Sequence, residues 1–312
     1  MIAAMRKKVS VIGAGNVGAT TAQLIVQSGL ADVVLFDVVE GMPQGKALDL
    51  AEACPVWNSP CSIKGTNSYS DTSGSDIIVI TAGLARKPGM SRSDLLHANA
   101  NIVKAVCSEI AGISPNAVVI VVTNPMDVMA QLAWKTTEFS CKRVMGMGGI
   151  LDASRLKSFI SMELEVSPED VDAIVFGGHG DDMVPMPRFS TVKGISITEL
   201  LSKKKIAALI ERTRNGGAEI VALLKSGSAY YAPAASTYQM VKAILLDEKR
   251  MLPCAAYLNG EYGIKDVYMG VPVILGREGV EKIVEVKLVR EEKAQLRKSC
   301  ESVRKLIKNL GI

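Results

Sequence analysis

His179 is one of only two histidines in the 312 residues, and it lies in the segment Gly177-Gly178-His179-Gly180-Asp181. An imidazole has an ordinary pKa near neutrality, so it can accept and return a proton at cellular pH. The flanking glycines leave out side-chain bulk that would keep a substrate away from the ring. The segment therefore indicates a general acid–base histidine, although a turn that happens to contain a histidine is the alternative.

A loop with two arginines is the second group that could do chemistry. Arg86 and Arg92 lie within residues 81–92, directly after the apolar run 77–80. Ligands of open α/β sheets bind beyond the carboxyl ends of the strands, and a glycine-containing loop at that place can close as a lid. Because a guanidinium group binds a carboxylate through two parallel hydrogen bonds, the loop indicates an anionic substrate. Solvent-exposed charges on a loop are the alternative.

Three more polar side chains extend this set. Asn124 follows the apolar run 117–122 and could donate a hydrogen bond to a substrate oxygen, or simply form an Asn-Pro turn. Asp152 and Arg155 lie three residues apart on a predicted helix and therefore share one face. They could form an ordinary ion pair within the helix. Alternatively, Asp152 orients the His179 ring while Arg155 binds a substrate carboxylate.

A dinucleotide-binding fingerprint lies near the N-terminus, in six consecutive residues: Gly13, Ala14, Gly15, Asn16, Val17 and Gly18. The first glycine permits a tight turn, the second lets the backbone approach a pyrophosphate, and the third packs a helix against a strand. The N–H groups at the start of that helix favour phosphate. Asp37 ends the next apolar run, where a carboxylate either accepts hydrogen bonds from a ribose or caps the strand end.

NAD is the predicted cofactor, because the Asp37 carboxylate would repel the 2′-phosphate of NADP and residues 38–39 supply no arginine to hold one. Further residues are predicted to border NAD, after the third and fourth apolar runs and on one helix: Thr81, Ala82, Gly83, Asn99, Val122 and Asn124. No metal site is predicted, because the six cysteines are scattered and no histidine stands at ligand spacing from them.

The elements that must position these side chains alternate in the first half of the chain. Near-continuous apolar runs predict strands buried on both faces, at residues 9–12, 33–36, 77–80 and 117–122. A helical pattern over residues 17–29 follows the fingerprint and ends at a glycine. This alternation predicts an α/β fold, with a doubly wound parallel sheet of the Rossmann type over residues 1–150.

The pattern changes in the second half. It predicts helices at residues 152–163, 211–225, 234–246 and 291–310, and strands at residues 173–176 and 271–275. This mixture predicts an α+β substrate-binding and catalytic domain over residues 151–312. No Pro/Gly/Ser-rich linker separates the halves, so we expect the two domains to pack closely.

The composition argues against several classes of function. The net charge is only +4, the basic residues are spread out and 4% of residues are aromatic, which argues against nucleic-acid binding. No apolar run approaches the roughly 18 residues that span a membrane. The N-terminus reaches its first strand within about ten residues, which leaves no room for a targeting peptide. Because scattered cysteines also favour a reducing compartment, we expect a cytoplasmic protein.

Together, these motifs resemble those of the lactate/malate dehydrogenase superfamily, in the branch of lactate dehydrogenase-like malate dehydrogenases. The resemblance covers essentially the whole chain and keeps the motif order of the family. It implies NAD-linked oxidation of a 2-hydroxy acid, in which His179 takes the hydroxyl proton and Asp152 orients the ring and stabilises the imidazolium. Arg155 would bind the C1 carboxylate, Arg92 would polarise the carbonyl, and Asn124 would hold the same oxygen.

The resemblance also implies a substrate and an assembly. Arginine at the position of Arg86 is typical of the malate enzymes of the family, whereas lactate enzymes usually carry a neutral residue there. We therefore expect malate and oxaloacetate as substrates, with lactate and pyruvate as the alternative. Family members are usually homo-oligomers, which favours a tetramer, with a dimer second. An NAD-dependent glycosidase and a catalytically silent NAD-binding protein are more distant alternatives.

Overall fold

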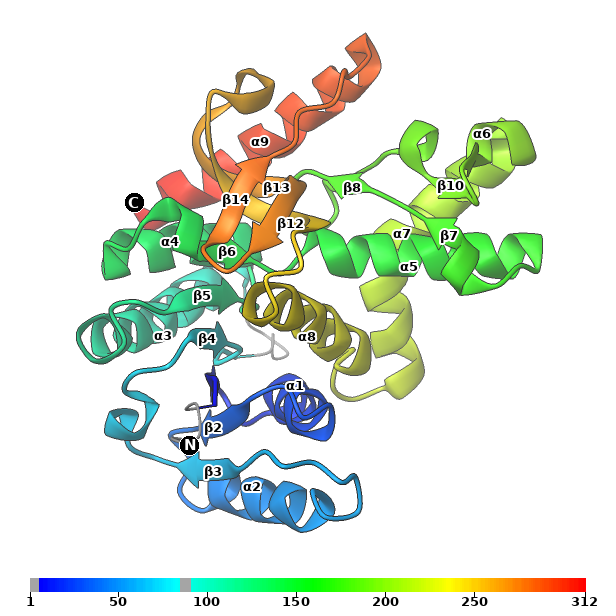
Figure 1. Ribbon diagram of the computed structural model, residues 1–312. Coiled ribbons are helices and arrows are strands. Elements are labelled where there is room, and N and C mark those ends of the chain that lie inside the picture. The colour runs from blue at the N-terminus through cyan, green and yellow to red at the C-terminus, as the bar shows by residue number, and fades with distance from the viewer. Residues whose placement is uncertain (1–5, 85–90) are drawn as a thin grey trace.

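A nine-stranded sheet forms the centre of the molecule in the computed structural model, which describes residues 6–84 and 91–312 (Figure 1). The strands follow the order β3-β2-β1-β4-β5-β6-β12-β13-β14 across the sheet. Their bounds are β1 (Lys8–Ile12), β2 (Asp32–Phe36), β3 (Ile63–Thr66), β4 (Ile77–Ile80), β5 (Val118–Val121), β6 (Val144–Gly146), β12 (Arg250–Asn259), β13 (Lys265–Gly276) and β14 (Gly279–Ile283).

Strands β1 to β6 pair in parallel, and their composition explains why. Both β4 and β5 consist only of valine and isoleucine, and every residue in them is buried. Strands buried on both faces are typical of a parallel sheet that helices cover. The predicted doubly wound α/β sheet is therefore confirmed. The strand order reverses between β1 and β4, so a ligand is expected beyond the carboxyl ends of these two strands.

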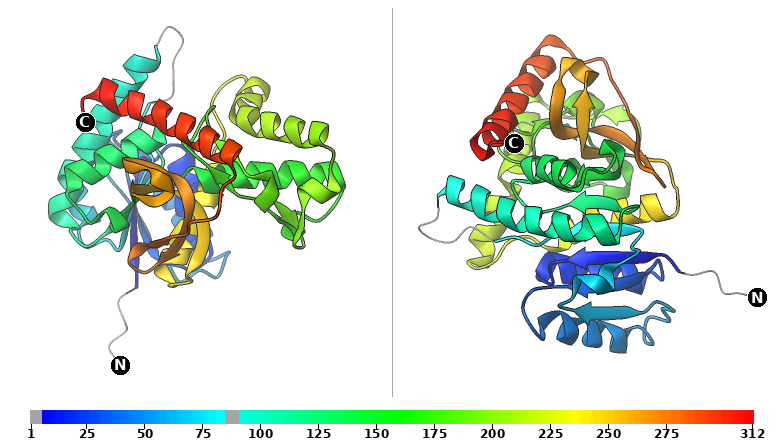
Figure 2. Two further views of the ribbon diagram at one scale, coloured as in Figure 1. Left: turned by 90° about the horizontal axis from the view of Figure 1, so that it is seen from above. Right: turned by 90° about the vertical axis from the view of Figure 1, so that its left-hand side faces the viewer.

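Helices cover both faces of this sheet. Helix α1 packs with α8 on one side, and α3 packs with α4 on the other (Figure 1). Helix α9 lies across α3, α4 and β13 (Figure 2). The α-helices among the described residues are α1 (Asn16–Gln27), α2 (Met42–Ala53), α3 (Arg92–Ile113), α4 (Met126–Thr137), α5 (Gly149–Leu164), α6 (Ile197–Leu200), α7 (Lys203–Leu224), α8 (Tyr231–Leu245) and α9 (Arg290–Leu310). The 3₁₀ helices are η1 (Tyr69–Thr72), η2 (Cys141–Arg143), η3 (Pro168–Asp170), η4 (Pro187–Phe189) and η5 (Glu261–Gly263).

The second half departs from the predicted boundaries most clearly at three elements. Strand β13, predicted at residues 271–275, begins at Lys265. Helix α7 begins at Lys203, well before residue 211, because the Ser202 side chain caps it by accepting a hydrogen bond from the Lys205 N–H. The strand predicted at residues 173–176 is strand β8, which spans only Val175–Phe176 and pairs with β9 (Val184–Pro185). The short strands of this half are β7 (Val171–Asp172), β8 (Val175–Phe176), β9 (Val184–Pro185), β10 (Thr191–Val192) and β11 (Ile195–Ser196).

Strands of the second half also extend the first sheet, which the sequence pattern did not predict. Strands β12 and β13 form an antiparallel pair, and Ala255 of β12 pairs with Gly146 of β6. Segments so far apart in the chain carry no local signal of their pairing, because a strand pattern reports burial and not the identity of the partner. The division of the chain at residue 150 stays a prediction.

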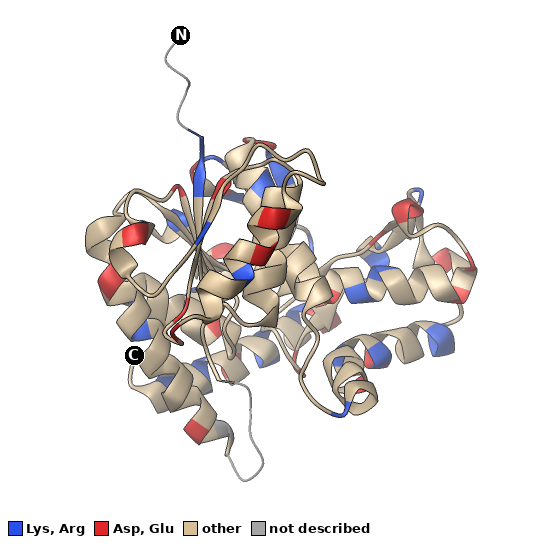
Figure 3. Cartoon of the chain, turned by 90° about the horizontal axis from the view of Figure 1, so that it is seen from below, with Lys and Arg blue, Asp and Glu red and all other residues tan. Residues whose placement is uncertain are grey.

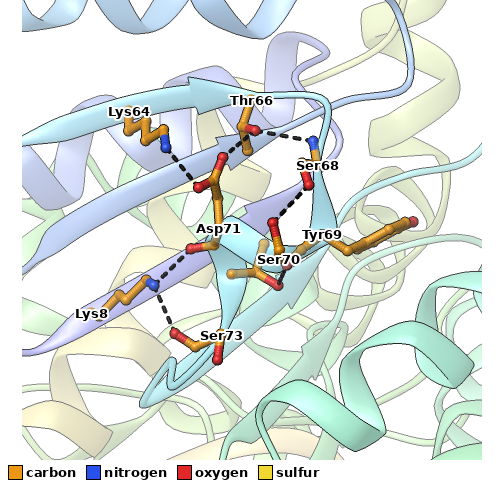
Figure 4. A network of polar contacts seen from close by, with 9 residues as sticks. Lys8, Lys64, Thr66, Ser68, Tyr69, Ser70, Asp71 and Ser73 are labelled. Atoms are coloured by element: carbon orange, nitrogen blue, oxygen red, sulfur yellow. Dashed lines mark hydrogen bonds and ion pairs between the residues drawn. The ribbon is translucent and has the colours of Figure 1, made fainter.

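A polar network fixes the connection from β3 to β4. Asp71 accepts a hydrogen bond from Lys64 Nζ at 2.6 Å, and Lys8 Nζ donates to the main-chain oxygen of Asp71 at 2.7 Å (Figure 4). The same connection stacks the ring of Tyr69 on that of Phe36, with ring centroids 4.1 Å apart. Phe36 ends β2 directly before Asp37, the predicted ribose-binding residue. Its pairing with Thr66 of β3 and its contact with Tyr69 therefore hold the end of β2 in place.

Charged side chains of both signs are interspersed along the helices of both halves (Figure 3). Within residues 6–84 and 91–312, no helix combines the length and apolar character needed to cross a lipid bilayer. All six cysteines lie in this part of the chain and are free. In the same residues, no three His, Cys, Asp or Glu side chains are grouped so that they could hold a metal ion.

Candidate active site

The glycine fingerprint forms the turn between β1 and α1. Gly13 has φ +109°, and a Cβ there would lie 2.7 Å from Ala82 N and from Thr81 Oγ1. A Cβ at Gly18 would clash with the Gly13 carbonyl, so only glycine lets α1 approach the strand this closely. At Gly15, by contrast, a Cβ would meet no atom of the described chain within 4 Å. This side of the turn therefore faces open space.

The start of α1 suits an anion. Its N-cap residue is Gly15, no side chain caps it, and its first turn carries no acidic residue. The first N–H groups of the helix, including those of Asn16 and Val17, therefore keep free hydrogen-bonding capacity. Together with the positive end of the helix dipole, they fit the pyrophosphate of a dinucleotide.

Side chains from the end of β2 and from α2 bind the main-chain N–H and the main-chain oxygen of Ala14. Asp37, at the end of β2, accepts hydrogen bonds from Ala14 N–H at 2.7 Å and from Val39 N–H at 3.0 Å. Lys46 Nζ, on α2, donates to Ala14 O at 2.7 Å. Asp37 thus does cap the strand end, and its oxygens retain lone pairs for a ribose. The sequence pattern did not reveal Lys46, because no motif spacing connects it to the fingerprint.

The remaining predicted cofactor residues lie directly after β4, directly after β5 and, in the case of Asn99, on α3. The buried Asn99 amide joins the two segments: Oδ1 accepts the Leu84 N–H at 2.7 Å, and Nδ2 donates to Asn124 O at 2.7 Å. Asn99 therefore positions the main chain on both sides, while the Asn124 side chain is exposed. The other residues of this group directly follow the two strands: Thr81, Ala82, Gly83 and Val122.

Of the two arginines predicted on the loop after β4, Arg86 lies outside the described residues. Arg92 is the first residue of α3. Ser91 and Asp94 cap this helix: Ser91 Oγ accepts the Asp94 N–H, and Asp94 Oδ2 accepts the Ser91 N–H, each at 3.0 Å. Arg92 therefore lies at the N-terminus of a helix whose first turn is capped by side chains.

The structure brings His179 and Asp152 together. Asp152 Oδ2 lies 2.8 Å from His179 Nδ1, and Asp152 Oδ1 lies 3.4 Å from Arg155 Nη1. The exposed fractions of these side chains are 2% for Asp152, 14% for His179 and 13% for Arg155. Asp152 therefore makes both contacts that the sequence left as alternatives, the ion pair within α5 and the contact with the imidazole. With Nδ1 bound to the carboxylate, Nε2 is the nitrogen that can exchange a proton.

The pKa of His179 is raised above its ordinary value. Burial acts to lower this pKa, but the charge and hydrogen bond of Asp152 and the charge of Asp127 together outweigh burial. Arg155 acts against these carboxylates, because its positive charge lowers the pKa of the ring. The two acids therefore favour the imidazolium form.

Arg155 lies against α7 at a point where that helix contains two consecutive glycines. A Cβ at Gly216 would lie 3.0 Å from Arg155 Cδ, whereas a Cβ at Gly217 would lie 3.6 Å from Arg155 Nη2. Gly216 therefore leaves the room that the arginine side chain occupies. Arg155 Nε is buried and has no hydrogen-bond partner in the described part of the chain, so donor capacity remains for an anion.

Two more side chains hold the His179 loop, and the sequence pattern revealed neither. Asp127 Oδ2, on α4, accepts the His179 N–H at 2.7 Å, and Ser299 Oγ, on α9, accepts the Gly178 N–H at 2.8 Å. Asp127 is an acid within the buried part of α4, which is the one signal that could have marked it. Ser299 lies 121 residues from Gly178 and carries no local signal.

A cavity of about 350 Å³ adjoins the loop and is lined by residues of α3, α4 and α9 together with His179. Asp152 and Arg155 do not line this cavity, but beside it the structure combines an imidazole, a carboxylate bound to it and a guanidinium group next to that carboxylate. Such a group of residues can exchange a proton with a substrate hydroxyl and bind a substrate carboxylate nearby. The turn for a dinucleotide follows β1 of the same sheet, which β4 separates from β5, the strand before α4.

Two family models match the chain. Residues 7–146 match the lactate/malate dehydrogenase NAD binding domain, and residues 150–310 match the lactate/malate dehydrogenase alpha/beta C-terminal domain. Together they cover most of the sequence.

Individual proteins match along their full lengths. The malate dehydrogenase of Heliobacterium modesticaldum is 56% identical over 98% of this chain and 99% of its own. Among solved structures, Cryptosporidium parvum malate dehydrogenase superposes with a TM-score of 0.96 at 45% identity, over 98% of this chain and 99% of that chain. The lactate dehydrogenase of the same organism, complexed with lactic acid and NAD, superposes with a TM-score of 0.96 at 41% identity, over 99% of each chain.

Proposed function

The chain belongs to the lactate/malate dehydrogenase family, and we propose that it catalyses the reversible NAD-dependent oxidation of (S)-malate to oxaloacetate. The N-terminal domain of the family binds NAD, so NAD is the cofactor. The observation that carries the proposal is the buried pair of His179 and Asp152, with 2.8 Å between Nδ1 and Oδ2. Its loop is bound to the first turn of α4, which follows β5 of the sheet whose β1 carries the dinucleotide turn.

The residues at the end of β1 suit NAD. Gly15 leaves the turn open, and the uncapped start of α1 offers N–H groups to the pyrophosphate. Asp37 presents carboxylate oxygens to the ribose and repels a 2′-phosphate, for which Val38 and Val39 offer no cation. When bound, NAD accepts the hydride that leaves C2 of malate.

His179 exchanges the proton of the substrate hydroxyl. In malate oxidation the neutral Nε2 accepts this proton, and in oxaloacetate reduction the imidazolium returns it. Asp152 holds Nδ1 and stabilises the imidazolium. Malate oxidation therefore loses rate as the pH falls through the pKa of His179, whereas oxaloacetate reduction loses rate as the pH rises through the same raised pKa.

The arginines bind the substrate. Arg155 binds the C1 carboxylate, and Arg92 and Asn124 hold the oxygen on C2, where negative charge develops during oxaloacetate reduction. Arg86 binds the second carboxylate, which pyruvate lacks, and so selects the dicarboxylic substrate. The relatives that carry the name malate dehydrogenase support this choice.

Steady-state kinetics test the proposal. With NADH, we expect kcat/KM for oxaloacetate to exceed that for pyruvate by at least about 10²-fold, because an unpaired guanidinium group disfavours the smaller substrate. NADPH should replace NADH poorly. Equal values of kcat/KM for oxaloacetate and pyruvate would instead favour lactate dehydrogenase, the activity named for the similar Cryptosporidium structure.

The substitution Arg86→Gln tests the residue that decides between these substrates. It should lower kcat/KM for oxaloacetate by about 10²-fold or more, a loss of a few kcal/mol at roughly 1.4 kcal/mol per factor of ten. Lys87→Gln is the matched control, since it removes the neighbouring positive charge and should leave the preference for oxaloacetate intact. An equal loss in both variants would mean that only the net charge of the loop matters.

The same proposal includes the assembly and its location. A cytoplasmic homo-oligomer, a tetramer before a dimer, is supported by exposed apolar side chains on three helices, including Leu48 on α2, Leu223 on α7 and Tyr231 on α8. The six free cysteines suit a reducing compartment. Light scattering should give four times the chain mass of 33.2 kDa, and a monomer mass would contradict the assembly.

A further inference from the structure

Asp127 is a buried carboxylate that holds the His179 loop from the side of α4. The residue is 4% exposed, and its Oδ2 accepts the His179 main-chain N–H at 2.7 Å. Its second oxygen, Oδ1, is buried and has no hydrogen-bond partner among the described residues. A buried charge without a full set of partners destabilises a fold, so its presence here calls for a reason.

The hydrogen bond alone does not require a charge. An asparagine at this position could accept the same N–H through its amide oxygen. The neutral Ser299 does hold the neighbouring Gly178 N–H, at 2.8 Å. What aspartate adds is a negative charge near the His179 imidazole, and that charge raises the pKa of the ring after the larger effect of Asp152.

We propose that Asp127 is a positioning residue for the proton transfer, which fixes the His179 main chain and supplies a second negative charge that stabilises the imidazolium. The inference rests on the proposed function, in which His179 is the acid–base group. When malate is oxidised, C2 loses a hydride, the hydroxyl O–H bond breaks and an Nε2–H bond forms. The ring thereby gains one positive charge, which Asp152 stabilises through Nδ1 and Asp127 stabilises through space.

The charged groups that act on this ring are Asp127 on α4, and Asp152 and Arg155 on α5. Asp181 and Asp182, on the loop itself, line the same cavity as His179. Burial raises the pKa of Asp127 to about 6, although the hydrogen bond from His179 N–H lowers it. Above that pH the Asp127 carboxylate is therefore ionised, and its charge is present when the enzyme works near neutrality.

Titration of the histidine rings by NMR tests the inference without relying on turnover. The chain has only two histidines, and the exposed His97 serves as an internal reference for His179. The histidine resonance that disappears in the His179→Asn variant belongs to His179, and the resonance that remains belongs to His97. In Asp127→Asn, which keeps an oxygen acceptor but removes the charge, we expect the titration midpoint of His179 to fall by roughly one pH unit.

Ser299→Ala is the matched control, because it removes the neighbouring anchor of the loop without changing any charge. The His179 midpoint in this variant should stay within about 0.3 pH units of the unmodified protein. Asp127→Glu retains the charge while it displaces the hydrogen bond, so its midpoint should stay well above that of Asp127→Asn. An unchanged midpoint in Asp127→Asn, or an equal fall in Ser299→Ala, would overturn the inference.

Kinetics then connect the charge to the reaction. In Asp127→Asn, the pH at which kcat/KM for malate falls to half should move down by the same amount, because the ring stays neutral to lower pH. Oxaloacetate reduction needs the protonated ring and should lose rate at a correspondingly lower pH. A shifted NMR midpoint without a shifted kinetic profile would contradict the acid–base role of His179. An unshifted NMR midpoint would contradict the role of Asp127 alone.

Discussion

The turn that carries the glycine fingerprint and the loop that carries His179 are assembled in different ways. The turn is one continuous segment, residues 13–18, and its shape follows from the glycines within it. The His179 loop is held by side chains from three helices, namely Asp127, Asp152 and Ser299. A continuous site can be recognised from spacing in the sequence, whereas a convergent site becomes recognisable only once the fold brings its parts together.

The two regions also use the main chain in opposite ways. In the turn, the main-chain N–H groups at the start of α1 are the proposed contacts of the coenzyme, and side chains such as Asp37 hold the main chain in place. In the loop, the imidazole is the proposed reacting group, and the N–H groups of Gly178 and His179 bind the side chains that hold the loop. Substitutions in the turn should therefore change coenzyme binding, and substitutions in the loop should change proton transfer.

The largest difference between the effect on proton transfer and the effect on coenzyme binding is expected for His179→Asn. Oxaloacetate reduction should slow by about 10²–10⁴-fold in kcat, because the general acid is lost. The dissociation constant of NADH, measured by fluorescence titration, should change by no more than about twofold, since the variant leaves the turn untouched. His97→Asn, on the exposed face of α3, is the matched control and should retain both properties. Loss of NADH binding together with turnover would show that the two regions are not separable.

The reverse effect is expected for Asp37→Ala. The N–H groups of Ala14 and Val39 lose their acceptor, and the ribose loses its carboxylate. The dissociation constant of NADH should rise by roughly 10–100-fold, as expected from the loss of one or two charge-assisted hydrogen bonds. At saturating NADH, kcat should stay within about threefold of the unmodified value, because the loop of His179 is unchanged. A kcat that falls as steeply as binding would contradict the division of labour.

The difference between features formed within one segment and features formed by distant segments also explains how much of the fold could be predicted. Strands β4 and β5 consist of valine and isoleucine and are buried throughout, so composition alone predicts them. The pairing of Ala255 with Gly146, which joins the second half to the first sheet, has no counterpart in the local sequence. It depends on two distant segments having compatible unpaired edges, and only the packed chain determines that.

The same difference separates the site residues that a sequence motif could assign from those that it could not. Gly15 and Asp37 could be assigned from a motif because the cofactor binds one short strand–turn–helix unit. The pairing of His179 with Asp152 was one of two alternatives left open by the sequence, a family resemblance favoured it, and the roles of both residues stay predictions. Asp127 could not be assigned, because an acid on a buried helix identifies no partner until the N–H that it accepts is known.

Lys46 offers a test of how far the turn depends on its neighbours. Lys46→Met removes the hydrogen bond from Nζ to Ala14 O, a contact worth about 1 kcal/mol, and should weaken NADH binding by about fivefold. Turnover at saturating NADH should be unaffected. Lys64→Met is the matched control, because Lys64 binds Asp71 in the β3–η1 network and not the turn (Figure 4). Equal weakening in both variants would point to a general effect of surface charge.

The smallest effect concerns the room that α7 leaves for Arg155. In Gly216→Ala, the new Cβ would approach Arg155 Cδ to 3.0 Å and displace the guanidinium by a few tenths of an ångström, so KM for oxaloacetate should rise by about three- to tenfold. Gly217→Ala brings a Cβ only to an ordinary 3.6 Å from Nη2 and should leave KM unchanged. Gly217→Ala replaces a helical glycine without a tight contact and should gain about 0.5–1 kcal/mol of helix stability, whereas the contact with Arg155 should offset this gain in Gly216→Ala. Thermal melts of both variants check that no change in KM comes from misfolding. Equal KM values in the two variants would mean that Arg155 adapts freely, and that its surroundings tolerate shifts that Gly13 and Gly18, where a Cβ would clash, do not.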